Sequence, residues 1–357
     1  MTPPFKIRRW LVPVGWVFGN VARLRRWLYA QGVFKSYKPE IPVVCVGNIA
    51  VGGTGKTPHA TYIVDLLSQK HNVAMLSRGY GRKTKGYILA NTTPPEQLSA
   101  ALIGDEPMLL HHRFPKLPLA VDGNRYEGVR NLTQYAPDTD VVVMDDAYQH
   151  LSFSPTVKLI LTEYRRPYFL DYPMPAGRLR EFPDAVAAAD VVIVTKVDDE
   201  YVDPLAWRKN LKLKDSQPLF FTKYSYGDPE PVTCCVGDDN LENVEVVLLT
   251  GISRPQPLVD YLSGKCKVVK HLNFPDHHVY TKFELEQIRH SLFSDEKNKR
   301  VLFTTEKDWM RLLSHNLREV VAQMPVYIVP IQVEFLTEEE KQSFQNILEE
   351  LCQKSKN

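Results

Sequence analysis

The sequence predicts an α/β protein, with a parallel sheet covered by helices on both faces and a second, smaller α/β lobe. Short, almost continuous apolar runs alternate with helical patterns, which is typical of parallel strands buried on both faces. A glycine-rich loop joins the first apolar run to the next helical pattern. After a long polar stretch, Asp198 to Asn243, the alternation resumes. We therefore expect two units with a boundary near residues 220–240.

Composition limits the class of protein. The 357 residues suit about two domains. Hydrophobic residues make up 44% and charged residues 24%, which is typical of a chain that buries a full core. The formal net charge of +2 gives no reason to expect a nucleic-acid partner. The five cysteines are scattered without a CxxC pair, which argues against a disulfide framework or a zinc site and favours the cytoplasm.

The expected elements follow from the apolar runs and their spacing. In the first unit we expect strands at Val43–Val46, Val73–Leu76, Leu117–Val121, Val141–Met144, Val157–Leu161 and Val191–Thr195, with a helix at Pro58–Lys70. In the second unit we expect strands at Val246–Leu249, Val268–Leu272 and Val301–Thr304, and helices at Pro257–Leu262, Lys282–Phe293 and Glu338–Cys352. The segments "FFTKY" and "YIVPIQV" are predicted to pair as strands that join the two lobes.

The N-terminal segment, residues 1–35, is basic and amphipathic. Its uninterrupted apolar run, Trp10 to Phe18, is nine residues long, whereas a membrane span needs about 20 apolar residues. From Trp16 to Tyr29 the pattern is helical, with arginines between the members of an apolar stripe: Val17, Val21, Leu24 and Leu28. Two interpretations remain open, a helix that lies in the lipid headgroup layer and an ordinary surface helix packed on the core.

The glycine-rich loop lies in the stretch "NIAVGGTGKTPHAT", Asn48 to Thr61. Gly55-Lys56-Thr57 fits the end of the phosphate-binding motif GxxxxGK[ST], although Ala50 replaces its first glycine. Lys56 would reach the outer phosphates and Thr57 would hold Mg2+, and the loop would wrap a phosphate with successive backbone amides: Val51, Gly52, Gly53, Thr54 and Gly55. A glycine-rich hairpin is the alternative. The strand–loop–helix order favours a P-loop NTPase-like core, which we assign to residues 36–225, with a C-terminal lobe at 226–357.

A second acidic motif supports this assignment. In "DVVVMDDAYQH" an apolar run ends at Asp145 and Asp146. Asp145 is expected to fix Mg2+ directly or through water, as the acid at the end of a neighbouring strand does in P-loop proteins. Two acids at a strand end are common, but their combination with the upstream loop favours the metal role. Which of the two aspartates contacts the ion stays open.

Three further motifs are ambiguous. "VTKVD", Val194 to Asp198, is similar to the guanine-reading motif of GTPases, so a P-loop GTPase or metallochaperone-type switch is the alternative function. "GDEP" places Asp105 and Glu106 either in a helix cap or in a catalytic site. "FPDHHVYT" contains Asp276, His277 and His278, which fit a turn, a general base, a metal pair or a phosphoesterase motif.

Seven segments, in order from about residue 40 to 310, resemble those of the tetraacyldisaccharide 4'-kinases, the lipid A 4'-kinases of Gram-negative bacteria. They are "VGNIAVGGTGKTP", "SRGYGR", "GDEP", "DDAYQH", "PAGRLRE", "FPDHH" and "TEKDW". The basic N-terminal segment also resembles the membrane-associated start of that family. One segment departs from the family pattern, because Ala147 and Tyr148 replace a Gly-Phe pair.

The resemblance implies that ATP donates its γ-phosphate to the 4'-hydroxyl of a tetraacylated glucosamine disaccharide 1-phosphate, a lipid A precursor, and forms lipid IVA. It implies an acid/base pair of Asp105 and His277, and Mg2+ bound by Thr57, Glu106, Asp145 and Asp146. It also implies a substrate site lined by Tyr80, Gln149, Arg180 and Glu181. The enzyme is then expected to be cytoplasmic and peripheral on the inner membrane, with no nucleic acid and no obligate protein partner.

Overall fold

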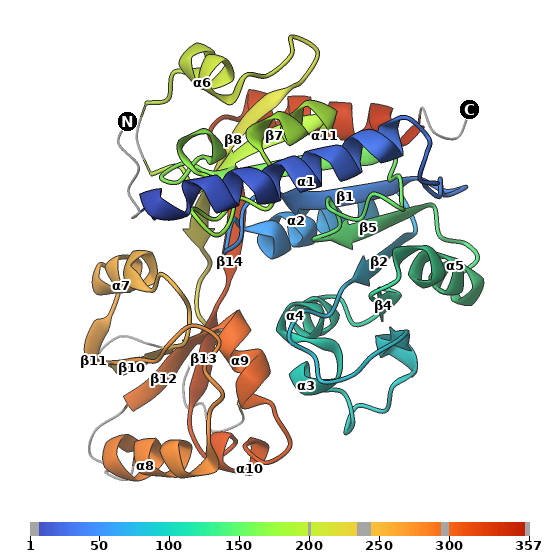
Figure 1. Ribbon diagram of the computed structural model, residues 1–357. Coiled ribbons are helices and arrows are strands. Elements are labelled where there is room, and N and C mark those ends of the chain that lie inside the picture. The colour runs from blue at the N-terminus through green and yellow to red at the C-terminus, as the bar shows by residue number, and fades with distance from the viewer. Residues whose placement is uncertain (1–6, 199–200, 234–243, 294–299, 354–357) are drawn as a thin grey trace.

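The computed structural model describes residues 7–198, 201–233, 244–293 and 300–353, which form two α/β units, each around its own sheet (Figure 1). The larger sheet has the strand order β14-β8-β7-β6-β1-β5-β2-β4-β3, and the smaller has the order β11-β10-β12-β13-β9. The predicted fold class is therefore confirmed. Of the cysteines, Cys45 and Cys266 are free thiols, and Cys234 and Cys235 lie outside the described residues.

The larger sheet is parallel except at its two edges, where β3 and β14 are antiparallel to their neighbours. Its strands are β1 Val43–Asn48, β2 Val73–Ser77, β3 Ile88–Leu89, β4 Leu119–Val121, β5 Val141–Asp145, β6 Val157–Glu163, β7 Val191–Thr195, β8 Leu219–Tyr226 and β14 Ile331–Phe335. The predicted strands are present. Strand β4 begins two residues later than predicted, after Pro118, which has no backbone N–H to donate to a sheet.

Both faces of the larger sheet are buried because side chains alternate along each strand. In β1, Val44 and Val46 join one core cluster, and Val43 and Cys45 join the other. The first cluster is covered by α2 Lys56–Ser68, α3 Ala100–Ile103, α4 Asp105–Arg113 and α11 Glu338–Gln353. The second is covered by α5 Arg125–Tyr135, α6 Pro204–Leu211 and the 3-10 helix η4 Pro183–Ala188. Other 3-10 turns are η1 Arg9–Leu11, η2 Ala90–Thr92 and η3 Tyr168–Leu170.

The smaller sheet contains β9 Glu230–Pro231, β10 Glu245–Thr250, β11 Lys267–Asn273, β12 Arg300–Thr305 and β13 Val326–Val329. One face packs on α7 Gln256–Ser263, and the other packs on α8 Lys282–Phe293, α9 Glu306–Leu312 and α10 Arg318–Val321. Helix α9 also contacts α4 of the larger unit. Leu110 of α4 and Met310 of α9 consequently belong to one continuous buried cluster.

Two chain segments cross between the units. Strand β8 leads from the larger sheet toward β9, and β13 leads back into β14. Strand β14 pairs with β8, with Val333 opposite Tyr224. The pairing predicted for "FFTKY" and "YIVPIQV" is therefore confirmed for the "IQV" end, whereas the "YIV" end belongs to β13 and pairs with β12 in the smaller sheet. As a result β14 and α11 pack on the larger sheet, although the sequence assigned all of residues 226–357 to the second lobe. Because β14 pairs with β8, it must belong to the larger sheet, as β8 does.

Helix α6 lies in the stretch that the sequence describes as polar and irregular. The Asp203 side chain caps it by accepting hydrogen bonds from the backbone N–H groups of Leu205 and Ala206. On its inner side, Trp207 and Leu211 are buried. Two buried side chains over eight residues give too weak an apolar pattern to predict a helix from the sequence.

Helix α1 Val12–Ala30 is longer than predicted and lies on the outside of the larger unit (Figure 1). Its buried residues are Gly15 and Gly19, which approach Pro173 and Phe182. Its large apolar side chains are mostly exposed: Val14, Trp16, Val17, Phe18, Val21, Leu24 and Trp27. Trp10, in the preceding turn η1, is exposed as well. The helix therefore packs on the larger unit through its glycines, while Val17, Val21 and Leu24 of the apolar stripe are exposed. In the described part of the chain, none of the helices has the length and apolarity that a membrane crossing requires.

Candidate active site

The candidate active site lies at the carboxyl edge of the larger sheet. The glycine-rich loop follows β1, Asp146 follows β5, and Lys196 follows β7. Since the carboxyl ends of parallel strands meet at one edge, these residues gather there, as ligand sites in open α/β sheets do. Across this edge the smaller unit presents His277, which follows β11, and helix α9, which follows β12.

The glycine-rich loop has the backbone that a phosphate cradle requires. Gly52 and Gly55 have φ angles of 116° and 92°, which disfavour residues with a Cβ. At Gly55 a Cβ would also collide with the Tyr224 hydroxyl, whereas at Gly53 it would meet no atom within 4 Å. Gly55 is the N-cap of α2, so the helix points its N-terminus into the loop. The residue that departs from the motif, Ala50, pairs with Leu179 in an isolated bridge.

Neighbouring strands hold this loop in place. The Asn48 side-chain amide donates a hydrogen bond of 2.7 Å to the Thr54 hydroxyl, and the Thr195 hydroxyl donates one of 2.9 Å to the Thr54 carbonyl. Lys196 donates to the Gly53 carbonyl and pairs with Glu163 at 2.7 Å. Asp198, by contrast, is half-exposed and pairs with Arg165 at 2.8 Å. The "VTKVD" segment thus supports the loop through Thr195 and Lys196.

Asp145 has the surroundings of a cation ligand. It is buried, its Oδ2 accepts a hydrogen bond of 3.2 Å from the Thr57 hydroxyl, and its Oδ1 has no partner among the described residues. Burial and the nearby Glu106 carboxylate raise the pKa of Asp145 to about 8, against the opposing effect of Lys56. A buried carboxylate with an orphaned oxygen and a second acid beside it fits a divalent cation.

Asp146 has different neighbours, although it adjoins Asp145. Arg180 Nη1 lies 3.0 Å and Lys56 Nζ lies 3.8 Å from its Oδ1. Burial opposes ionisation, but the two cations prevail and lower the pKa of Asp146. Within the described residues no three His, Cys, Asp or Glu side chains form a metal cluster, so an ion here would need phosphate or water oxygens as further ligands.

The structure brings Asp105 and His277 together from the two units. Gly104 is the N-cap of α4, so Asp105 lies in the first turn and does not cap the helix itself. His277 has a φ of 60° in the segment that follows β11. Its Nδ1 lies 3.4 Å from Asp105 Oδ2. The Tyr80 ring stands edge-on to the His277 imidazole, with ring centroids 6.4 Å apart.

Arg311 of α9 is a site residue that the sequence analysis missed. Its Nε donates a hydrogen bond of 2.8 Å to Asp105 Oδ2, and its Nη2 lies 3.2 Å from His277 Nδ1. Burial opposes ionisation of Asp105, but His277 and Arg311 outweigh it and lower the pKa of that carboxyl. An arginine two residues after the "TEKDW" segment carries no sequence signal, because only the packing of α9 against α4 brings it to Asp105.

His278 has a separate role from His277. Its ring stacks on Phe274, with centroids 4.6 Å apart, and its Nε2 lies 3.2 Å from Glu284. Glu284 in turn accepts a hydrogen bond of 2.8 Å from the backbone N–H of Thr281 at the start of α8. These contacts tie His278 to the beginning of that helix, and they do not support a metal pair with His277.

The remaining predicted residues lie beside the loop and beneath α1. The Gln149 side chain donates a hydrogen bond of 2.7 Å to the Asn48 carbonyl and accepts one of 3.0 Å from Arg180. Glu181 is buried and pairs through both carboxylate oxygens with Arg26 of α1. Arg180 and Gln149 therefore belong to the Asp146 side of the site, and Glu181 connects this side to the N-terminal helix.

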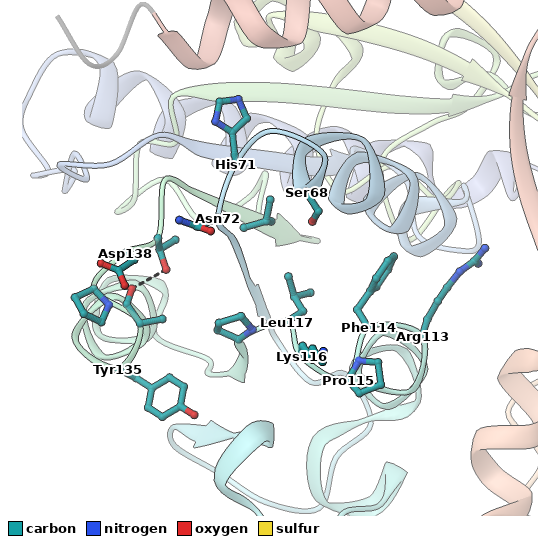
Figure 2. A pocket seen from close by; sticks show the side chains of 15 residues that line it. Ser68, His71, Asn72, Arg113, Phe114, Pro115, Lys116, Leu117, Tyr135 and Asp138 are labelled. Carbon is teal, nitrogen blue, oxygen red and sulfur yellow. Dashed lines mark hydrogen bonds between the residues drawn. The ribbon is translucent and has the colours of Figure 1, made fainter.

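A large cavity of about 740 Å³ lies elsewhere on the molecule. Figure 2 shows its lining, including His71, Phe114, Leu117 and Asp138. These residues precede or adjoin the amino ends of β2, β4 and β5, at the edge of the sheet opposite the glycine-rich loop. None of the predicted site residues lines this cavity, so the size of a cavity does not identify the active site here.

The fold and the loop define a P-loop kinase class of protein, in which a second α/β unit faces the phosphate-binding edge. Within that class, the family model for tetraacyldisaccharide-1-P 4'-kinases matches residues 7–353, and the chain belongs to this family. It is 38% identical to the tetraacyldisaccharide 4'-kinase of Phocaeicola vulgatus, over 99% of this chain and 97% of that protein. It is 37% identical to that of Bacteroides thetaiotaomicron, over 96% and 93%.

A solved structure agrees with this assignment. LpxK from Aquifex aeolicus, crystallised in complex with ATP, superposes with a TM-score of 0.75 at 26% identity, over 97% of this chain and 99% of that one. The family membership favours an ATP-dependent kinase over the switch and phosphoesterase alternatives that the sequence left open.

Proposed function

We propose that the protein is a lipid kinase that transfers the γ-phosphate of ATP to the 4'-hydroxyl of a tetraacyldisaccharide 1-phosphate, forming lipid IVA in lipid A biosynthesis. The family membership supports the reaction. The observation that carries the chemistry is the contact of Asp105 with His277 across the two units. We infer that these two residues act as the acid/base pair for an acceptor bound at the edge that carries Lys56.

ATP is proposed to bind with its phosphates on the loop amides from Val51 to Gly55 and on Lys56. Mg2+ would be held by Thr57 and Asp145, with Glu106 and Asp146 beside them, because Asp145 has an orphaned oxygen and a carboxylate neighbour. When bound, the ion neutralises charge on the transferred phosphoryl group. Phosphoryl transfer depends mostly on positioning and charge neutralisation, which the proposed arrangement would provide.

The acceptor hydroxyl must lose its proton as the phosphoryl group arrives. Asp105 is proposed to take this proton as general base, and His277 to support it at hydrogen-bond distance. Arg311 keeps the Asp105 carboxylate ionised before the acceptor binds, since a charged hydrogen bond favours the charged form. Exposed Tyr80 next to His277, and Gln149, Arg180 and Glu181 on the opposite side, are the proposed lining of the acceptor site.

The acceptor carries acyl chains and resides in a bilayer, so the enzyme is proposed to work on the cytoplasmic face of the inner membrane as a peripheral protein. The exposed tryptophans and valines of α1 support this location, because a soluble protein rarely leaves such a continuous apolar stripe uncovered. Neither a nucleic acid nor an obligate protein partner enters the proposal.

The test is an incubation of the purified full-length protein with γ-labelled ATP, Mg2+ and a detergent-dispersed tetraacyldisaccharide 1-phosphate. We expect label in a lipid that carries one more phosphate than the acceptor. The same mixture with an acceptor blocked at the 4'-hydroxyl should leave the lipid unlabelled. Release of labelled phosphate without lipid labelling would instead indicate a hydrolase and overturn the proposal.

A further inference from the structure

The Arg311 side chain is buried, and its guanidinium has hydrogen-bond partners in both units. Only 8% of the residue is exposed. Its Nη1 donates hydrogen bonds of 2.9 Å to the Gly251 carbonyl and to Asp308 Oδ1, both in its own unit. Its Nε donates to Asp105 Oδ2 at 2.8 Å, in the other unit. The planar guanidinium is therefore fixed from one side and aims its remaining donors at the proposed acid/base pair.

We propose that Arg311 is the positioning residue that sets the geometry of Asp105 and His277 when the two units meet. The proposal rests on the proposed function, since it assigns a role within that reaction. A guanidinium has five donors in a rigid fork, so one side chain can fix a carboxylate and an imidazole at the same time. Arg311 makes both contacts, and no flexible link lies between them.

The position of His277 Nδ1 shows what this arrangement achieves. This nitrogen lies 3.4 Å from Asp105 Oδ2 and 3.2 Å from Arg311 Nη2. With a proton on Nδ1 the imidazole can donate to Asp105, and without that proton it can accept from Arg311. The ring consequently has a partner in both states without rotating. A proton can then move between the acceptor hydroxyl and the pair while the catalytic geometry stays unchanged.

Interface stability alone would be a simpler role for Arg311. The structure offers a comparator for that role, because a second ion pair joins the same two helices. Arg113 of α4 lies 3.6 Å from Glu306 of α9. This pair connects the units without touching Asp105 or His277 in the structure. Arg113→Ala should therefore weaken the contact between α4 and α9 but leave Asp105 and His277 in their positions.

The experiment compares full-length Arg311→Ala, Arg311→Lys and Arg113→Ala in single-turnover and steady-state assays with ATP, Mg2+ and the lipid acceptor. Arg311→Ala should reduce the chemical step about 100-fold, as expected for a misplacement of about 1 Å. Its KM for ATP should stay within about twofold of wild type, since Arg311 does not touch the phosphate loop. Lysine keeps the charge but not the fork, so Arg311→Lys should lose about tenfold. Arg113→Ala should change the chemical step less than about threefold.

A double-mutant cycle separates positioning from folding effects. On a His277→Ala background, Arg311→Lys should cost almost nothing further, because residues that act as one unit are strongly non-additive. Melting curves identify a variant that fails to fold, in which case Arg311→Lys carries the test. Equal losses in Arg113→Ala and Arg311→Lys, additive losses in the cycle, or a near wild-type rate in Arg311→Lys would overturn the inference. A wild-type protein that labels no lipid would instead refute the proposed function.

Discussion

Arg26 of helix α1 and Glu181 of the loop beside Asp146 form a two-pronged ion pair, with both N–O hydrogen bonds at 2.8 Å. Arg26 also lies over the Tyr148 ring, at 4.9 Å from its centroid. Arg180, the neighbour of Glu181, holds Asp146. Glu181 therefore connects α1, the helix proposed to meet the membrane, to Arg180 and Asp146 beside the phosphate loop. The stability of this connection can be measured directly.

Arg26→Ala should destabilise the protein by about 3 kcal/mol, because it leaves the buried Glu181 carboxylate without its partner. Arg23→Ala is the matched control on the same helix. Its ion pair with Asp184 is about half-exposed at both ends, so the loss should be below about 1 kcal/mol. Urea unfolding of both variants measures the difference. Equal losses would mean that Glu181 does not depend on α1.

Lys56→Ala should remove most phosphoryl transfer, by about 100- to 1,000-fold, since it deletes a cation aimed at the transferred phosphoryl group. Lys56 is largely buried, and its Nζ lies 3.8 Å from Asp146 Oδ1. Arg180 remains as a partner of Asp146 in the variant, so the fold should persist. Lys70→Ala, beyond the far end of α2, is the control and should be active. Normal turnover in Lys56→Ala would contradict the P-loop assignment.

The protein should use ATP in preference to GTP, and Asp198→Ala should leave that preference unchanged. Asp198 is the residue that would read guanine in the "VTKVD" motif, but it is half-exposed and pairs with Arg165. Arg165→Ala frees Asp198 from this pair and serves as the control. Competition kinetics with the two nucleotides decide the question. A GTP preference that disappears in Asp198→Ala would restore the switch hypothesis.

Replacing Trp16 and Trp27 of α1 together by serine should weaken binding to vesicles that contain anionic lipid. Both side chains are more than half exposed, and burial of a large apolar side chain contributes about 1.5–3 kcal/mol. Basic residues on the helix contribute about 1 kcal/mol each near such a surface, so added salt should weaken binding in wild type as well. Tyr201→Ser, at an even more exposed aromatic position outside α1, is the control. Unchanged vesicle sedimentation would exclude α1 as the membrane contact.

The fold was predictable because local patterns determine most of it. Val43 to Val46 is buried on both faces and reads as a continuous apolar run, and Gly55-Lys56-Thr57 marks the turn into α2. Helix α6 was not predictable, since only Trp207 and Leu211 mark its buried side. The pairing of β14 with β8 was predicted from their apolar segments, but the packing of α11 on the larger sheet was not, because it depends on that pairing over more than 100 residues.

The candidate site was predictable where residues lie next to a strand end, as Asp145 and Asp146 do. The approach of Asp105 to His277 was available only through the family resemblance, because the two lie on different units. Arg311 was not predictable at all. Its contact with Asp105 comes from the packing of α9 on α4, which leaves no motif in the sequence.

The proposed acid/base pair predicts a particular pattern of losses. Asp105→Asn keeps the shape of the side chain but cannot take a proton, and His277→Ala removes its partner. Each should slow the chemical step by about 10² to 10⁴, the usual range for general acid–base catalysis. The double variant should be little worse than the slower single, because the two groups act on one proton. ATP affinity should hardly change in His277→Ala.

His278→Ala is the internal control for this pair. His278 stacks on Phe274 and pairs with Glu284 at the start of α8, so its loss should lower the melting temperature and leave the chemical step within about threefold of wild type. Single-turnover rates at saturating ATP measure all four variants. Additive losses for Asp105 and His277, or a slower chemical step in His278→Ala than in His277→Ala, would show that the base is another group. Asp146 and Asp276 would then be the next candidates, because Asp146 adjoins Lys56 and Asp276 Oδ1 lies 3.9 Å from His277 Nε2.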